Sequence, residues 1–245
     1  MSKKMFTLLK GELVRLNKYN VTTITIAITF VWFIILYFVE DNGALNTLLP
    51  MIILVDTAMM SIIYIGSVLF FEKSEFTIST LLVTPVKYAD HIIAKVLAIT
   101  IETIFSSLLI VLVFYFIRDI TVVWWALAIA LILPTMLASL VGFAISYHTK
   151  DFTSLLSWVM GYVFLTFIPI ILNYMDLVFK GDFWRYFFLI LPVGSALEIT
   201  AVAIGEPITL AFYIALGVTF ISTGLLYFLY VLPKFKDYAV KQSGV

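Results

Sequence analysis

The sequence contains no cysteine in its 245 residues and little charge of either sign. Without cysteine, a disulfide framework, a catalytic thiolate and a thiolate metal site are all excluded. Lysine and arginine together number 15, as do aspartate and glutamate, so the formal net charge is zero. A nucleic-acid-binding chain normally shows a basic excess, and we therefore expect no nucleic-acid partner.

Apolar residues are abundant instead. Hydrophobic residues make up 63% of the chain, charged residues only 12%, and the mean hydropathy is +1.12. A soluble domain is about half apolar and a quarter charged, so this surface must be solvated by lipid. Runs of about 17–25 nearly uncharged residues predict spanning helices. Six such runs predict an all-α, single-domain membrane protein with spans at residues 21–39, 44–71, 96–117, 120–147, 152–175 and 208–232.

The basic residues distinguish the two sides of the membrane. With six spans and a cytosolic N-terminus, only Arg118, Lys180 and Arg185 lie outside the cytosol. We therefore predict a multi-pass protein of the cell membrane with both termini cytoplasmic. Another apolar stretch, residues 184–204, would place the lysine-bearing tail outside if it spanned. We predict that it enters the outer leaflet and returns, as two short helices broken at residues 192–194, with a seventh span as the alternative.

The first 20 residues have a different pattern. At helical spacing, Met5, Leu9 and Leu13 share one face of residues 3–18, and lysines such as Lys10 lie opposite. This pattern predicts a short amphipathic helix in the inner interface, with its lysines toward anionic headgroups of membrane lipid. The alternative is a basic flank that happens to be helical.

The stretch from residue 72 to residue 95 is longer than a simple reversal of direction requires. Apolar and polar residues alternate at helical spacing over 72–84, which predicts a helix lying at the cytosolic surface. Thr84 is a suitable N-cap and Pro85 suits the first position of the next helix. We interpret the segment as a docking surface for a soluble partner. An ordinary cytosolic loop is the alternative.

This stretch resembles the signature of ABC-2-type permeases, the membrane subunits of type-2 ABC exporters. The matching pattern is Glu-x-x-x-Thr-x-x-x-Leu-Leu-x-Thr-Pro-Val, followed by an acidic residue and a lysine. It is filled here by Glu72 or Glu75, Thr77, Leu81, Leu82, Thr84, Pro85, Val86, Asp90 and Lys95. The family's usual glycine before the threonine is Phe76 here, which puts the local helix geometry in doubt.

The resemblance implies a function and its partners. Residues 72–82 correspond to the coupling helix that seats on a nucleotide-binding subunit, residues 1–20 to the connecting helix, and residues 184–204 to re-entrant helices. The residues expected to dock the ATPase are Glu72, Lys73, Glu75, Thr77 and Ser79. No Gly-x-x-x-x-Gly-Lys-Ser/Thr loop occurs, so ATP is expected on a separate ATPase subunit and this chain needs no cofactor of its own. A second permease, identical or related, would complete a substrate path for a drug, peptide or lipid.

Polar residues inside the predicted spans are few. Asp56 and Glu102 are the only deep carboxylates, and such groups usually face protein or water. With Met60, they are candidates for the substrate path, and a purely structural role is the alternative. A second set, Thr22, Thr25 and Thr29, falls on one face of the first span. That face is a candidate dimer seam, or equally a packing face within the subunit.

Other classes of membrane protein fit less well. An intramembrane protease needs a Ser–His dyad, a metal-binding histidine pair or paired aspartates. Ser195 is expected across the bilayer from His91 and His148, which we expect to be solvated flanks, and Asp56 has no aspartate partner. We therefore predict no catalytic residue and no metal ligand. The alternative function is an ion- or proton-coupled secondary transporter using Asp56 and Glu102.

Overall fold

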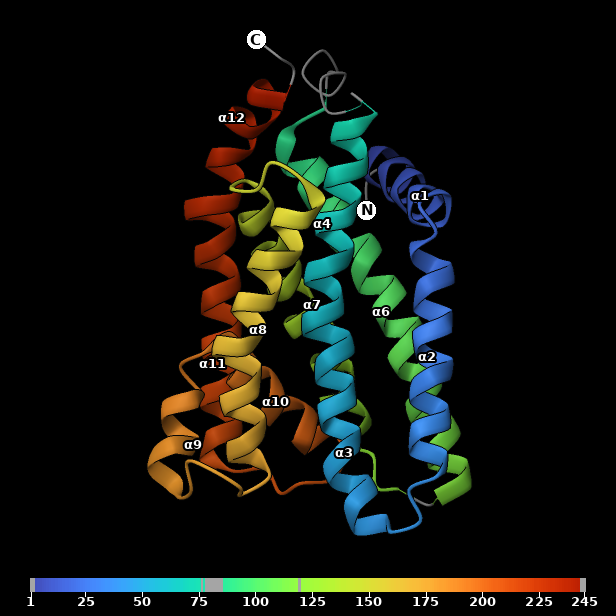
Figure 1. The fold of residues 1–245 in the computed structure, drawn as a ribbon, viewed down its shortest axis with the longest axis vertical. Coiled ribbons are helices and arrows are strands. Elements are labelled where there is room, and N and C mark those ends of the chain that lie inside the picture. Colours follow the sequence, from blue (N-terminus) through green and yellow to red (C-terminus); the bar gives the residue numbers. More distant parts are fainter. Residues whose placement is uncertain (1–2, 76, 78–85, 119, 243–245) are drawn as a thin grey trace.

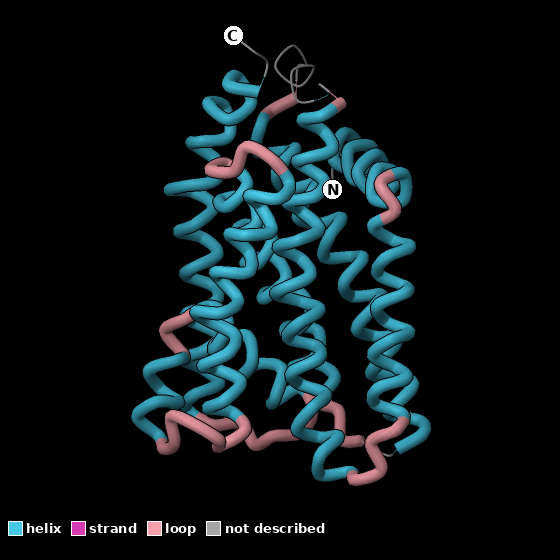
Figure 2. The backbone as a smooth tube through the Cα atoms, in the orientation of Figure 1, coloured by secondary structure: helices cyan, strands magenta, loops and turns pink. Residues whose placement is uncertain are grey.

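The computed structural model describes residues 3–75, 77, 86–118 and 120–242. All regular structure in these ranges is helical, as Figure 2 shows. The helices in the first half are α1 (Lys3–Lys18), α2 (Val21–Tyr37), α3 (Asn42–Leu54), α4 (Ser61–Ser74) and α6 (Tyr88–Arg118). Those in the second half are α7 (Trp124–Ser146), α8 (Phe152–Tyr174), α9 (Asp182–Phe188), α10 (Pro192–Ala203), α11 (Leu210–Leu225) and α12 (Leu232–Gln242). Two π-helical segments, η1 (Val55–Met60) and η2 (Leu226–Val231), join α3 to α4 and α11 to α12.

Five helices are long and apolar enough to cross a membrane. They are Asn42–Ser74, Tyr88–Arg118, Trp124–Ser146, Phe152–Tyr174 and Leu210–Ala239. Two further pairs, α1 with α2 and α9 with α10, are apolar enough together but are bent by 66° and 111°. The chain is therefore an all-helical, multi-pass membrane protein, as predicted. Figure 1 places both termini at one end of the bundle and α9 with α10 toward the other.

The helices of the structure differ in length from the predicted spans. The first span ends at Tyr37, because the chain turns there and Asp41 caps α3 by accepting a hydrogen bond from the Ala44 amide at 2.8 Å. The third helix begins eight residues before the apolar run, at Tyr88, and the second runs on to Ser74. The fourth begins at Trp124, and the last continues past residue 232. Hydropathy marks an apolar run, and the helix that contains the run can end inside it or extend beyond it.

The break between α9 and α10 also differs from the prediction. The chain turns over residues 189–191, and Pro192 is the first residue of α10 instead of the break itself. Proline suits this position because it has no amide hydrogen to leave unpaired. Gly194 allows the tight bend, since a Cβ there would lie 2.1 Å from the Phe188 carbonyl oxygen.

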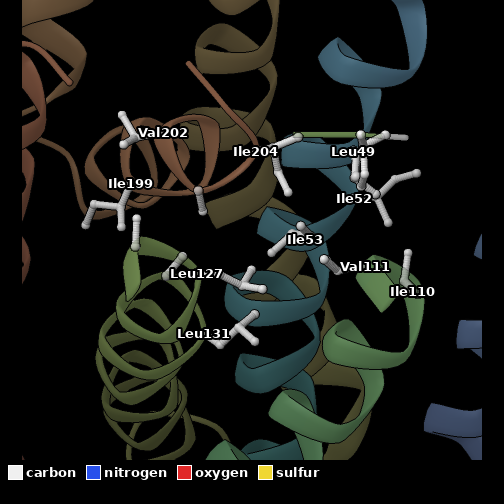
Figure 3. Close-up of a cluster of buried hydrophobic side chains, with 14 of the residues drawn as sticks. Leu49, Ile52, Ile53, Ile110, Val111, Leu127, Leu131, Ile199, Val202 and Ile204 are labelled. Atoms are coloured by element: carbon white, nitrogen blue, oxygen red, sulfur yellow. The ribbon is translucent and has the colours of Figure 1, made fainter. Parts of the chain in front are cut away.

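The largest buried apolar cluster holds α10 inside the bundle. Leu49, Ile52 and Ile53 come from α3 and meet Val111 of α6 and Leu127 of α7. Figure 3 shows these side chains converging with Ile199, Val202 and Ile204 from α10 and its C-terminal end. Every residue of α10 after Pro192 is buried. In the turn before α10, Leu189 is buried and Ile190 is exposed, so protein covers this irregular backbone only in part.

Candidate functional site

A cluster of four charged side chains lies at the end of the bundle that holds both termini. We call Glu12, Arg15, Glu72 and Lys95 the ion cluster. Lys95 is 2% exposed, and its ammonium donates to Glu12 Oε2 at 2.9 Å and also bonds Glu72 Oε1. Arg15 donates to Glu12 Oε1 at 2.9 Å and to Glu72 Oε1 at 2.8 Å. These contacts tie α1 to α4 and α6.

The ion cluster is balanced, with two carboxylates and two cations. A buried charge is tolerated only when it is paired and hydrogen-bonded, and this arrangement meets that condition for Lys95. Glu72 Oε2 is the exception, since it has no hydrogen-bond partner among the described residues. A further pair outside the cluster, Lys4 with Asp90 at 3.1 Å, joins α1 to the start of α6. The amphipathic helix is thus fixed to the bundle by ion pairs as well as by its apolar face.

His91 corrects an expectation from the sequence. The sequence predicts a solvated flank, yet His91 is 4% exposed and lies one helical turn before Lys95. Neither of its ring nitrogens has a hydrogen-bond partner in the described part of the chain. The packing of α1 over this end of α6 covers what the sequence presents as a cytosolic flank. His148, by contrast, is exposed, as expected.

The predicted docking residues divide into four groups. Glu72 faces Lys95 inside the ion cluster, so its carboxylate does not face outward as a docking residue would. Lys73 and Glu75 lie at the surface, where Lys73 donates to the Lys150 carbonyl at 2.6 Å. The Thr77 hydroxyl donates to the Glu72 carbonyl at 3.1 Å. Ser79 and most of the predicted helix over 72–84 lie outside the described residues.

Glu75 is held by the N-terminal helix. Its carboxylate accepts hydrogen bonds from Lys18 at 2.8 and 2.9 Å and from the Tyr19 hydroxyl at 3.0 Å. The hydrogen bond from Lys18, followed by that from Tyr19, keeps the pKa of Glu75 below its ordinary value. The carboxylate therefore stays ionised under mildly acidic conditions, and its negative charge remains at this end of the bundle.

A second polar region lies deeper among the helices. We call Thr29, Asp56, Ser61, Thr103, Ser106 and Ser107 the polar seam. Asp56 is 1% exposed and accepts a hydrogen bond from the Ser107 hydroxyl at 2.5 Å. Ser61 pairs with Thr103 at 3.3 Å, and Thr29 pairs with Ser106 at 2.7 Å. The seam therefore joins η1, α4 and α2 to one face of α6.

Asp56 sits in the π-helical segment η1, which spans Val55–Met60. A π-helical turn is rare and frequently marks a functional position in a longer helix. Met60, at the end of η1, is half-buried against an apolar cluster that includes Tyr64 and Ile99. Glu102 is buried on α6, and its Oε1 has no hydrogen-bond partner among the described residues. Asp56 is thus enclosed by helices of its own chain and does not lie on an open surface.

The threonine face of α2 is turned toward its own subunit. Thr25 is 2% exposed, and Thr29 contacts Ser106 of α6. Thr22 is half-buried on the same face. These contacts support the packing alternative for this face over the dimer seam. The side of α2 that carries Ile26, Phe30 and other large apolar residues is the exposed one.

A cavity at the other end of the bundle is not evident from the sequence. It measures about 420 Å³ and lies among α8, α9 and α10. Arg185 reaches Glu198 with two hydrogen bonds of 3.2 and 2.6 Å, and Tyr174 donates to Glu206 at 2.8 Å. A signal was present, because Arg185 and Glu198 lie within the otherwise apolar segment 184–204 and Glu206 follows it. Their pairing depends on the 111° bend, which hydropathy does not reveal.

No family model, no curated protein and no solved structure matches this chain. The geometry and the sequence pattern therefore carry the functional argument by themselves.

Proposed function

We propose that this chain is the permease subunit of an ATP-driven exporter of the ABC-2 type. The observation that carries the proposal is the pattern over residues 72–95, between two helices whose facing ends are held together by the ion cluster. Glu72 lies near the end of one apolar helix, Asn42–Ser74, and Lys95 lies near the start of the next. A soluble partner that pushed on the segment between them would move both helices as one body.

Three charged residues of the pattern, Glu72, Asp90 and Lys95, have a role different from direct docking. Glu72 and Lys95 bind each other and α1, while Asp90 pairs with Lys4 of α1. We infer that they hold together the ends of the two helices that flank residues 76–87, and that the partner acts on this part of the chain. Lys73 and Glu75 at the surface remain the candidates for contact with the ATPase.

The rest of the assembly follows from this role. ATP would bind a separate ATPase subunit, because the sequence has no phosphate loop. A second permease, identical or related, would complete the path for a drug, peptide or lipid. We infer six spans, cytoplasmic termini in the plasma membrane, and α9 with α10 as a re-entrant pair. Both termini lie at one end of the bundle in Figure 1, and the lysines of the two terminal segments support this orientation.

One observation favours a second candidate, an ion- or proton-coupled carrier. Asp56 is a buried carboxylate at a π-helical segment, and such residues often bind coupling ions in carriers. Its hydrogen bond from Ser107 comes from a neutral hydroxyl, and no ion pair among the described residues compensates its charge.

The test is to purify the tagged chain from its own membranes and identify what accompanies it. The proposal expects a separate phosphate-loop ATPase in the complex, and ATP turnover by the complex but not by the chain alone. A chain that purifies without an ATPase and accumulates substrate in vesicles under an ion gradient is a carrier, and the exporter proposal is then wrong.

A further inference from the structure

An apolar groove opens on the surface between α7, α8 and η2. Its volume is about 630 Å³. One wall is Val141, Ala144 and Ile145 of α7, and Leu226 of η2 adds another. The α8 wall is formed by Ser157, Trp158, Gly161, Tyr162 and Leu165. No residue of the ion cluster or the polar seam lines it.

The groove has a polar rim at one end. His148 Nε2 and the Tyr230 hydroxyl form a hydrogen bond there. The Lys234 ammonium lies 4.0 Å from the centroid of the Tyr230 ring, a cation–π contact. Both His148 and Lys234 are exposed, and Lys234 belongs to α12, at the end of the bundle with both termini.

We propose that this groove binds one anionic phospholipid from the leaflet on the side of the termini. Its acyl chain lies along α8, and its phosphate lies beside Lys234. The walls are apolar along their length, which suits a hydrocarbon chain. The rim presents a tyrosine, a histidine and a cation, the side chains that proteins place at headgroup depth. Charge complementarity therefore selects an anionic headgroup over a neutral one.

The dimensions argue against a helix from a second copy. The groove runs from Ser157 to Leu165 of α8, eight residues or roughly 12 Å. Two spanning helices that pack together normally share much of a membrane thickness of about 30 Å. The groove is shorter than such a contact, and its apolar walls suit a chain of methylene groups.

The first test measures lipid retention by the purified full chain in native mass spectrometry. The two probes are dioleoylphosphatidylglycerol and dioleoylphosphatidylcholine. Wild type is expected to retain the anionic lipid preferentially. Lys234→Gln should weaken that retention about fivefold, the effect of one lysine near an anionic headgroup. Lys236→Gln is the matched control: Lys236 is also exposed on α12 and lies two residues away, and this variant should keep the preference.

The second test fills the groove. A Cβ at Gly161 meets no atom within 4 Å, so Gly161→Leu places its side chain in open space without a clash. This variant should fold and lose retention of the phosphatidylglycerol. Gly217→Leu is the control, because Gly217 of α11 is equally open and does not line the groove. In parallel, dibromo-phosphatidylglycerol should quench a fluorescence component that is missing in Trp158→Phe.

Three results would overturn the proposal. One is equal retention of the two lipids by wild type, and another is unchanged retention in Gly161→Leu. The third is a disulfide between two Gly161→Cys copies, which would show that a second copy occupies the groove. The natural chain has no cysteine, so that cross-link has no competing thiol. The proposal concerns the chain alone and holds whether or not an ATPase partner is found.

Discussion

The helix Asn42–Ser74 carries two buried carboxylates in different surroundings. Glu72 lies in the ion cluster, where Lys95 and Arg15 bond it directly. Asp56 lies 16 residues earlier, roughly 24 Å away, and accepts its hydrogen bond from the neutral Ser107. The first environment is balanced in charge and joins three helices. The second leaves a carboxylate among hydroxyl groups.

This difference separates a structural role from a functional one. Paired buried charges resist removal of any one member, because the remaining charges are left uncompensated. A lone carboxylate in a membrane helix is costly to keep, and proteins that keep one generally use it. We therefore expect substitutions in the ion cluster to lower stability, and substitutions at Asp56 to affect transport first.

The largest effect is expected for Lys95→Met. It leaves Glu12 and Glu72 buried with only Arg15 between them, so the folded state should lose about 3–5 kcal/mol. Thermal unfolding in detergent should show a clearly lower midpoint, and α1 should become sensitive to protease. Lys236→Met, at an exposed position, is the control. A midpoint equal to wild type would mean that the ion cluster does not stabilise the fold.

A double variant tests whether Glu72 and Lys95 stabilise each other. Glu72→Met together with Lys95→Met removes one charge of each sign and keeps the apolar volume. The double variant should be more stable than the sum of the two single effects predicts, by about 0.5–3 kcal/mol. Strict additivity in the cycle would show that the two side chains do not interact.

Asp56→Asn should have a smaller effect on stability. Asparagine keeps an oxygen that accepts from Ser107, so the loss should stay within about 1.5 kcal/mol. Transport of the substrate should nevertheless fall strongly in reconstituted vesicles, with assembly unchanged. Glu72→Gln is the matched comparison, and its main effect should be lower stability instead of weaker transport. An Asp56→Asn protein that transports normally would place this carboxylate among the structural groups.

Arg185→Gln tests a charge pair at the opposite end of the bundle. The Arg185 side chain is 41% exposed, so its pair with Glu198 is screened by solvent and should contribute at most about 1 kcal/mol. Gln is long enough to keep one hydrogen bond. The unfolding midpoint should therefore move less than in Lys95→Met. An equal shift would mean that ion pairs at the two ends stabilise the fold alike.

The smallest effect concerns pH and Glu75. Its pKa in the folded chain lies below the ordinary glutamate value of 4.5, because Lys18 and Tyr19 hydrogen-bond the charged form. Its contribution to stability is then fully present above pH 4.5 and is lost as the pH falls through the lower folded pKa. The midpoints of wild type and Glu75→Gln should differ at neutral pH and converge under strong acid. A gap between the two midpoints that widens on acidification would contradict a lowered pKa at Glu75.

Much of the fold could be predicted from the sequence, because lipid imposes a simple rule on composition. Long apolar runs become helices, and the amphipathic pattern over residues 3–18 coincides with α1. Helix ends are harder to predict from hydropathy. The helix α6 begins at Tyr88, and its first turns contain polar residues that do not belong to the apolar run. The predicted break before α10 is misplaced because proline both ends and begins helices, and the sequence does not say which.

The candidate site was less accessible to sequence reasoning. The docking prediction includes Glu72, because the sequence pattern carries no information about what packs against this carboxylate. A signal did exist: Glu12 is the single acidic residue in an otherwise basic helix, and Arg15 follows it by three residues. Such an exception indicates a specific partner. Only the tertiary contact of α1 with α6 identifies that partner as Lys95.

The helix Leu210–Ala239 is 30 residues long, or roughly 45 Å, and so exceeds a hydrocarbon layer of about 30 Å. Because this helix is long, a small tilt produces a large displacement at its far end. A tilt of about five degrees at one end displaces the other by roughly 4 Å over that length. The C-terminal part of this helix contacts α6. Phe235 of α12 packs on Tyr88, the first residue of α6, with ring centroids 5.7 Å apart. A small movement where α11 begins would thus displace the contact beside residues 86 and 87, at the opposite end of the bundle.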